Sequence, residues 1–175
     1  MTKHPSTPTD GTITLVPASR NLLQAELNDP PAVFNILDVD AAPPYWPPDL
    51  NDDDSFRHAL NLIPAGAQTA DWGFYYVLLH EGGQRHAIGL GGFKEQPDEN
   101  GEVEIGYSIL EPYRRRGFAT RMTGLLVDHA FADPSVTAVT ATTLPDLIPS
   151  IGVLEKVGFR QTNLLDGILY FSLLR

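Results

Sequence analysis

The clearest pattern in the chain is an alternation of apolar residues with polar or small ones over residues 103–110. A repeat of two residues is typical of a β-strand, in which neighbouring side chains point to opposite faces of a sheet. Pro112 ends the strand, because proline has no N–H to donate to a ladder of hydrogen bonds. The alternation therefore predicts one strand followed closely by a turn.

A second pattern begins after Gly117 and has the period of a helix. Its apolar or small residues recur every three or four positions, at Ala119, Met122, Leu126 and Ala130. That spacing predicts a helix over 117–133 with one face toward a core. Glycine at its start allows a backbone path that a side chain would obstruct. The central stretch thus predicts a strand, a tight turn and a helix.

The N-terminal part predicts a tail, a strand and a helix. Residues 1–11 are rich in Pro, Thr and Ser and are expected to form a flexible tail, so the folded domain spans 12–175. After a first strand, Ser19 can cap a helix that continues to Asn28. The pair Pro30-Pro31 is expected to stop this helix.

Residues 41–50 contain four prolines, too many for a helix or a central strand. They are predicted to form a stiff loop that carries Tyr45 and Trp46. These two aromatic side chains either pin the loop to the core or form a wall of a substrate pocket. A helix capped within residues 51–54 is expected to follow and to end near Leu62.

The later runs predict most of a sheet. Strand-like runs at 72–80 and 86–94 are joined by a Gly-containing turn, and with the central strand they predict an antiparallel meander. The glycines at 89–92 do not mark a dinucleotide loop, because no helical pattern follows them.

The C-terminal part predicts two strands after a strand and a helix. A β-branched run over 136–143 predicts the first strand, and Asp146 can cap a helix that ends at Gly158. Strands at 159–164 and 168–174 are expected to complete the sheet.

The composition restricts the classes of function. A chain of 175 residues is long enough for one domain with a buried core. The net charge of −10 argues against a nucleic-acid surface, and no cysteine is present for a disulfide or thiolate site. No stretch approaches the ~18 apolar residues of a membrane span, and the five histidines lack metal-ligand spacing with carboxylates. We expect a cytoplasmic protein with no metal, membrane or nucleic-acid partner.

The turn into the 117–133 helix has the chemistry of a phosphate site. A helix N-terminus presents N–H groups without helix partners and the positive end of the macrodipole. Three consecutive arginines at 114–116 add positive charge, and their side chains either bind phosphate or are plain surface charge. A nucleotide site for ATP is a weaker alternative, because the loop lacks the Gly-Lys-Ser/Thr sequence that binds phosphate and magnesium.

The pattern Arg114-x-x-Gly117-x-Ala119 after a Glu-Ile-Gly-Tyr strand resembles the acyl-CoA pyrophosphate loop of the GNAT superfamily of N-acetyltransferases. Residues 153–159, Val-Leu-Glu-Lys-Val-Gly-Phe, resemble the closing helix of the branch that includes ribosomal-protein N-terminal acetyltransferases. The resemblance covers about residues 12–175. It implies a single-domain α/β fold of the α+β kind, with a mixed, mostly antiparallel sheet splayed near its middle and helices on both faces.

The resemblance also implies acetyl-CoA as co-substrate. Backbone groups at the end of the central strand would pair with the pantetheine arm, and an N–H there would polarise the thioester carbonyl. N–H groups of the loop would hold the pyrophosphate. The implied cofactor-binding residues are Ile109, Leu110, Arg114, Arg115, Arg116, Gly117, Phe118, Ala119, Thr120 and Ser150.

Amine acetylation needs a base, because an alkyl amine is mostly protonated at neutral pH. Many members of the resembled family hold this base at the position of Glu104. Glu102 shares a face of the strand with Glu104, so spacing cannot separate the two carboxylates. The alternative role for Glu104 is structural, facing solvent or pairing with an arginine.

Three positions depart from the family pattern. Leu154 stands where many members have the tyrosine that protonates the leaving thiolate, Leu147 where an asparagine is usual, and Pro149 where a small residue is usual. Ser150 either relays the proton through water or only hydrogen-bonds the cofactor. These departures predict weak activity or an unusual choice of substrate.

We therefore expect an acetyl-CoA-dependent N-acetyltransferase that transfers the acetyl group directly to a primary amine, as a monomer or homodimer. The acceptor is expected to be a small amine or a protein N-terminus, and the acidic composition favours a cationic one. The alternative is a catalytically weak or inactive acyl-CoA-binding sensor, motivated by Leu147 and Leu154.

Overall fold

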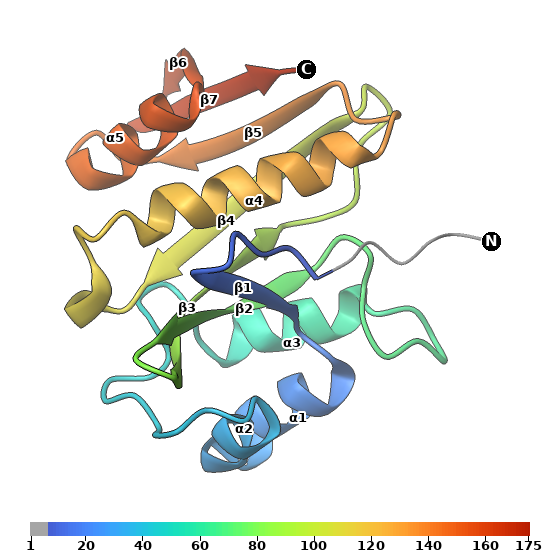
Figure 1. Ribbon diagram of the computed structural model, residues 1–175. Coiled ribbons are helices and arrows are strands. Elements are labelled where there is room, and N and C mark those ends of the chain that lie inside the picture. Colours follow the sequence, from blue (N-terminus) through green and yellow to red (C-terminus); the bar gives the residue numbers. More distant parts are fainter. Residues whose placement is uncertain (1–6) are drawn as a thin grey trace.

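Residues 7–175 are described by a computed structural model built on one seven-stranded sheet (Figure 1). The strands are β1 (Ile13–Pro17), β2 (Phe74–Glu81), β3 (Gln84–Phe93), β4 (Glu102–Ile109), β5 (Ala138–Thr143), β6 (Arg160–Leu165) and β7 (Ile168–Leu174). They lie in the order β1-β2-β3-β4-β5-β7-β6, and every neighbouring pair is antiparallel except β4 with β5. The predicted mixed, mostly antiparallel sheet is confirmed.

Helices cover both faces of this sheet, as predicted. The helices are α1 (Arg20–Asn28), α2 (Pro30–Ile36), α3 (Asp53–Leu62), α4 (Phe118–Ala132) and α5 (Ile148–Val157). One buried cluster joins α1, α2 and α3 to alternate residues of β2 and β3. A second cluster joins α4 and α5 to the other face, where α4 lies across the sheet in Figure 1. The apolar residues of β4, including Val103 and Ile105, belong to this second cluster.

The sheet divides between β4 and β5. These two strands pair at only three positions, Glu102 with Ala138, Val103 with Val139 and Glu104 with Thr140. Beyond these pairs β4 continues to Ile109 and β5 to Thr143 without pairing to each other. The two strands therefore form a split that begins at Glu104 and lies at their carboxyl ends, which is the predicted splay.

The first two helices bring one correction and one confirmation. The Pro30-Pro31 pair was expected only to stop a helix, but Pro30 begins α2. Proline is tolerated there because the N–H groups of a first turn need no helix partner. Ser19 caps α1 as predicted, since its side chain accepts a hydrogen bond from the Leu22 N–H at 3.2 Å.

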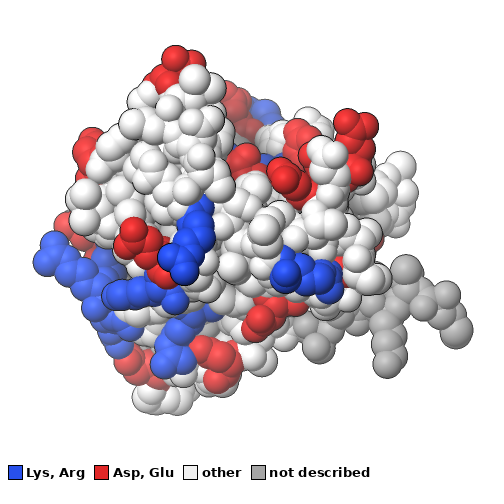
Figure 2. Space-filling model, turned by 90° about the horizontal axis from the view of Figure 1, so that it is seen from above, with Lys and Arg blue, Asp and Glu red and all other residues white. Residues whose placement is uncertain are grey.

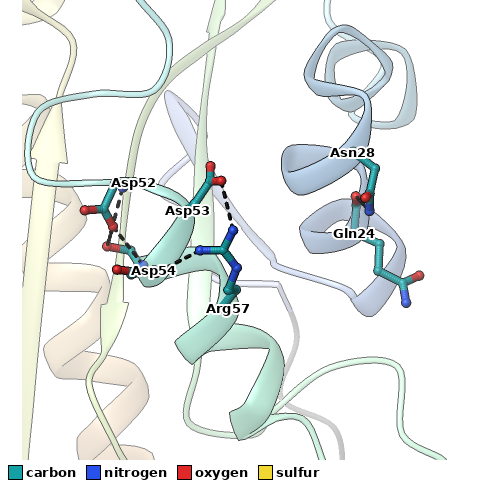
Figure 3. A network of polar contacts seen from close by, with 7 residues as sticks. Gln24, Asn28, Asp52, Asp53, Asp54 and Arg57 are labelled. Carbon is teal, nitrogen blue, oxygen red and sulfur yellow. Dashed lines mark hydrogen bonds and ion pairs between the residues drawn. The ribbon is translucent and has the colours of Figure 1, made fainter.

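The start of α3 confirms a predicted cap (Figure 3). The Asp52 carboxylate accepts a hydrogen bond from the Ser55 N–H at 2.9 Å, and the Ser55 Oγ accepts one from the Asp52 N–H, which makes a capping box. Arg57 pairs with Asp53 at 3.1 Å and with Asp54 at 2.8 Å. All three side chains of these ion pairs are exposed, so the cap and not the ion pairs supplies most of the local stability.

Three further differences concern the start of α5, the end of β4 and the N-terminal segment. Asp146 was expected to cap α5, but the helix begins after Leu147 and no side chain caps it. Leu110 was expected to end β4, but it begins a short 3-10 turn, η1 (Glu111–Tyr113). The predicted tail is tied down in part, because Asp10 caps the Thr12 and Ile13 N–H groups and pairs with Arg121 at 2.6 Å. Residues 1–6 of that tail lie outside the described residues.

The loop at 41–50 is pinned by Trp46, the first of its two predicted alternatives. The indole ring packs edge-on against Phe34 and stacks on Tyr76. Its Nε1 donates to the carboxylate of Glu26 at 3.1 and 3.2 Å, and the Tyr76 hydroxyl donates to the same carboxylate at 3.1 Å. Tyr45 is 86% exposed and belongs to neither core cluster.

Glu26 is buried, and its two hydrogen-bond donors are both neutral. Desolvation by burial outweighs these hydrogen bonds and raises the pKa of its carboxyl group. None of the α-helices in the described part of the chain is both long and apolar enough to cross a lipid bilayer.

We predict that Glu26→Gln stabilises the protein at pH 7 by about 1 kcal/mol, the scale of one buried polar substitution. A group whose pKa is raised by folding loses stability as pH rises through its folded pKa. The amide keeps an acceptor for Trp46 and Tyr76 but carries no charge. The advantage should therefore shrink as the pH falls through the raised folded pKa of Glu26, and it should be absent below the value for an unfolded glutamate, about 4.3. Urea unfolding at several pH values measures it, with exposed Glu155→Gln as control. A variant that is less stable at pH 7 would contradict this account of Glu26.

Candidate functional site

The backbone of β4 presents unused hydrogen-bonding groups to the split. The Lys94 N–H donates to the Glu104 carbonyl and the Leu110 N–H donates to the Ile88 carbonyl, each at 2.9 Å. In an antiparallel ladder, successive residues point their backbone N–H and C=O groups to opposite sides of the strand. These two bonds show that the even-numbered residues of β4 point theirs toward β3. The intervening odd-numbered residues, Tyr107 and Ile109, therefore point their N–H and C=O groups toward β5. Because β5 has diverged there, that edge is open for an extended chain.

The two residues predicted to pair with pantetheine differ in what they offer. Ile109 keeps its N–H toward the split, while its carbonyl accepts a hydrogen bond from Arg114 Nε at 2.7 Å. The N–H of Leu110 is already bonded to β3. Of the two residues, Ile109 is therefore the one whose N–H is open to a cofactor, because η1 begins only after this last ladder bond.

The turn between β4 and α4 forms an open helix N-terminus. Arg115 and Gly117 both have left-handed backbone, with φ of 59° and 83°. The first α-helical bond of α4 runs from the Arg121 N–H to the Gly117 carbonyl, so the N–H groups of 118–120 lack helix acceptors. A Cβ at Gly117 would meet no atom within 4 Å. Unpaired N–H groups, the positive end of a 15-residue helix and open space together suit a phosphate group.

The arginine side chains of this turn mostly organise the loop itself. Arg114 pairs with Asp49 at 2.6 Å, which ties the 41–50 loop to the end of β4. Arg116 pairs with Glu81 at 2.5 Å and lies 4.9 Å from the centre of the Phe118 ring. Figure 2 shows basic side chains gathered at the left edge, the side on which Figure 1 places this turn, with acidic ones among them. The groups that this loop leaves available for a phosphate are therefore mainly its backbone N–H groups and less its arginine side chains.

Glu104 lies where the split begins. It is the last residue of β4 that pairs with β5, and it points to the face opposite the α4 core cluster. Its Oε1 accepts hydrogen bonds from Thr142 Oγ1 of β5 at 2.8 Å and from Lys94 Nζ at 2.5 Å. The side chain is 31% exposed. The carboxylate thus reaches across the base of the split, with a lysine as its ion-pair partner in place of the predicted arginine.

An acidic cavity of about 700 Å³ adjoins Glu104 on this face. Its lining comes from the start of α3, the turn after β3 and the base of β4, and its ionisable groups are Asp52, Asp54, His58, Lys94, Glu95, Asp98, Glu102 and Glu104. Hydrogen bonds from backbone N–H groups are the largest cause that lowers the pKa of Asp52 and of Asp98. The cavity therefore carries negative charge at neutral pH and favours a cationic guest.

The other face of the split is bridged by Tyr107, which the sequence did not single out. Its hydroxyl donates to the backbone carbonyl of Ser150, in the first turn of α5, at 3.3 Å. Burial raises the pKa of the Tyr107 phenol. Leu154, at the position of the usual acid, is 1% exposed and belongs to the core. Alternation placed Tyr107 on an apolar face of β4, which hid its polar tip.

These predicted residues thus lie around one split. Glu104 is on one side of it, Ser150 is on the other side, and the helix start at 117–120 is at its mouth. Tyr45 and Trp46 do not line the acidic cavity. No contact in the described residues supports the substrate-binding role predicted for them.

Comparison with known proteins agrees with this geometry. Residues 20–160 match the family model described as "Acetyltransferase (GNAT) domain". The uncharacterized N-acetyltransferase YjdG of Bacillus subtilis (strain 168) is 36% identical over 72 residues, which are 41% of this chain and 43% of that protein. The matched segment therefore spans less than half the length of this curated relative.

Solved structures of low sequence identity share the fold. An acetyltransferase of the GNAT family from Bacillus anthracis superposes with a TM-score of 0.63 at 17% identity, over 97% of this chain and 98% of that one. RimJ of Mycobacterium smegmatis, solved with CoA-disulfide, gives 0.62 at 22% identity, over 96% and 84%. The family model covers most of the chain, and the split sheet and the open α4 N-terminus are the features expected of that family. The chain belongs to the GNAT acetyltransferase family.

Proposed function

We propose that this protein is an acetyl-CoA-dependent N-acetyltransferase that transfers the acetyl group directly to a primary amine. The observation that carries the proposal is the split at Glu104, which has an open helix N-terminus at its mouth and an acidic cavity at its base. A diphosphate joined to an extended, amide-bearing arm fits the first part, and a cationic amine fits the second.

Each part of the cofactor would be bound by particular groups of this chain. The N–H groups of residues 115–120 would hold the pyrophosphate, and the Ile109 N–H would pair with the pantetheine arm. Arg114 would act indirectly, because its guanidinium holds the Ile109 carbonyl and Asp49. Ser150 would lie beside the cofactor on the α5 side. That RimJ of M. smegmatis was solved with CoA-disulfide supports this assignment.

Glu104 would accept the proton that the amine must lose. Both hydrogen bonds to its carboxylate from the described residues go to Oε1, so Oε2 is left to accept the proton, and Glu104 lines the cavity. Acetyl-CoA, when bound, supplies an acetyl thioester. The Tyr107 N–H, which faces the same split and lies closer to Glu104 than the Ile109 N–H does, would donate to the thioester carbonyl and stabilise developing negative charge. Glu102 lines the same cavity and is the second candidate base.

The acidic cavity supports a cationic acceptor. A small amine and a protein N-terminus carry the same ammonium group, so both stay within the proposal. A cytoplasmic location and a monomeric or homodimeric state stay predictions from the sequence. The buried Leu154 and the Leu147 at the α5 start favour a second function, a weak or inactive acyl-CoA sensor, which would bind acetyl-CoA without turnover.

We predict that Gly117→Trp lowers the affinity for acetyl-CoA at least tenfold, because an indole would cover the N–H groups that open α4. Gly66→Trp is the matched control, since Gly66 is also exposed, has φ of 80° and has no atom within 4 Å of a built Cβ. Both variants should lose a similar ~1–2 kcal/mol of stability to left-handed backbone. Calorimetric titration measures the affinity, and equal binding by the two variants would contradict the proposed loop.

We predict that Glu104→Gln lowers kcat by about 100-fold or more, the usual scale of a lost general base, while acetyl-CoA binding stays unchanged. Glu102→Gln is the control, with less than a threefold loss expected. Thiol release is measured over a panel of polyamines, small monoamines and peptides with free N-termini. A full loss in Glu102→Gln with turnover retained in Glu104→Gln would transfer the role of base to Glu102.

A further inference from the structure

Two side-chain bridges cross the split between β4 and β5, one on each face. On the α3 side, Glu104 reaches Thr142 of β5 at 2.8 Å. On the α4 side, the Tyr107 hydroxyl reaches the Ser150 carbonyl of α5 at 3.3 Å. The two residues lie three positions apart on one strand, so their side chains point to opposite faces. A group held between the strands would have a carboxylate on one side and a phenol on the other.

The leaving side of the reaction lacks the usual acid. Leu154 is buried in the core and has no proton to give. Of the two hydroxyl residues at the α5 bridge, the phenol of Tyr107 is the better acid, since tyrosine titrates near 10 and a serine hydroxyl does not titrate in water. Burial raises the pKa of Tyr107, which keeps its hydroxyl protonated at neutral pH.

The remaining phenols of the described chain are committed elsewhere or lie apart from α5. Tyr76 donates to Glu26 in the α1 core, and Tyr75 bonds to His129 at 3.3 Å. Tyr113 packs in η1 near His86, and Tyr45 is exposed on the proline-rich loop. Tyr170 of β7 points away from α5, because its neighbours Leu169 and Phe171 face the cluster that contains α4 and α5. Tyr107 is the phenol that both crosses the split and contacts the first turn of α5.

We propose that Tyr107 is the proton donor to the thiolate that leaves during acetyl transfer, on the face of the split opposite Glu104. The inference rests on the proposed function. As the carbon–sulfur bond breaks, its electron pair goes to sulfur, and the Tyr107 hydroxyl gives sulfur a proton. An acceptor that binds as the ammonium loses two protons through Glu104, one before nitrogen attacks and one after, and Glu104 passes each to water. Tyr107 regains one proton from water. Of the two protons from the amine, one therefore ends on the thiol and one in solvent.

Tyr107→Phe tests the assignment, because it keeps the ring in the core and removes only the hydroxyl. We expect kcat to fall by about 100-fold, the usual effect of one lost general acid. The KM for the amine and the calorimetric Kd for acetyl-CoA should each change less than about twofold. A merely structural role would instead loosen cofactor binding or lower thermal stability along with kcat. Tyr170→Phe, on partly buried β7, is the control and should keep wild-type kcat.

Ser150→Ala separates the phenol from the serine hydroxyl. Ser150 is proposed to lie beside the cofactor, so this variant is expected to weaken acetyl-CoA binding. The Tyr107 bond goes to the Ser150 backbone, so kcat at saturating acetyl-CoA should fall far less than in Tyr107→Phe. If the wild type turns over and the kcat of Tyr107→Phe is within about threefold of the wild-type value, the assignment of Tyr107 is overturned but the proposed function is not. A large loss in Ser150→Ala but not in Tyr107→Phe would give the role to serine. Wild-type protein that binds acetyl-CoA but releases no thiol with any acceptor would overturn the proposed function itself.

Discussion

The loss of pairing between two parallel strands is the constraint on which the rest of this structure depends. β4 and β5 are joined at three positions at the base of the sheet and then separate. A backbone group left without a partner and shielded from water costs about 1–3 kcal/mol. The N–H and C=O groups of Tyr107 and the N–H of Ile109 are therefore an unfinished part of the ladder, while the Ile109 carbonyl is bonded to Arg114. A ligand with its own amides completes that ladder in the way a further strand would.

The surrounding elements keep this edge open and shaped. β3 holds the alternate groups of β4, with bonds at both Glu104 and Leu110. Arg114 binds both the Ile109 carbonyl and Asp49, so it links the turn before α4, the end of β4 and the proline-rich loop. Trp46 and buried Glu26 anchor the far side of that loop in the α1 core. The open N-terminus of α4 is thereby fixed beside the split.

Much of the fold follows from local patterns in the sequence. The alternation over 103–110 and the helical repeat after Gly117 predicted β4 and α4, and Ser19 predicted a cap, because these signals act within a few residues. The same reasoning missed α2, because a proline pair reads as a stop and also suits a first turn. Asp146 was an equally good local cap that the chain does not use.

The site was less predictable, because its contacts join residues far apart in the chain. The resemblance to the GNAT family predicted roles for the loop at 114–120 and for Glu104. No spacing in the sequence could place Lys94 and Thr142 on one carboxylate oxygen. The acidic cavity combines α3 with the base of β4, and only the folded sheet brings them together. Tyr107 was missed because alternation in the sequence shows which face of the sheet a side chain lies on. It does not show what the hydroxyl of that side chain bonds to.

The central claim is that the open edge of β4 and the start of α4 receive one extended ligand. Amide hydrogen exchange, followed by NMR with and without acetyl-CoA, tests it at single residues. The account predicts slower exchange at Tyr107, Ile109 and residues 118–120 when acetyl-CoA is added, and no change at Leu110, which is already bonded to Ile88. Unchanged exchange at Ile109 and at 118–120 in the presence of saturating acetyl-CoA would contradict it.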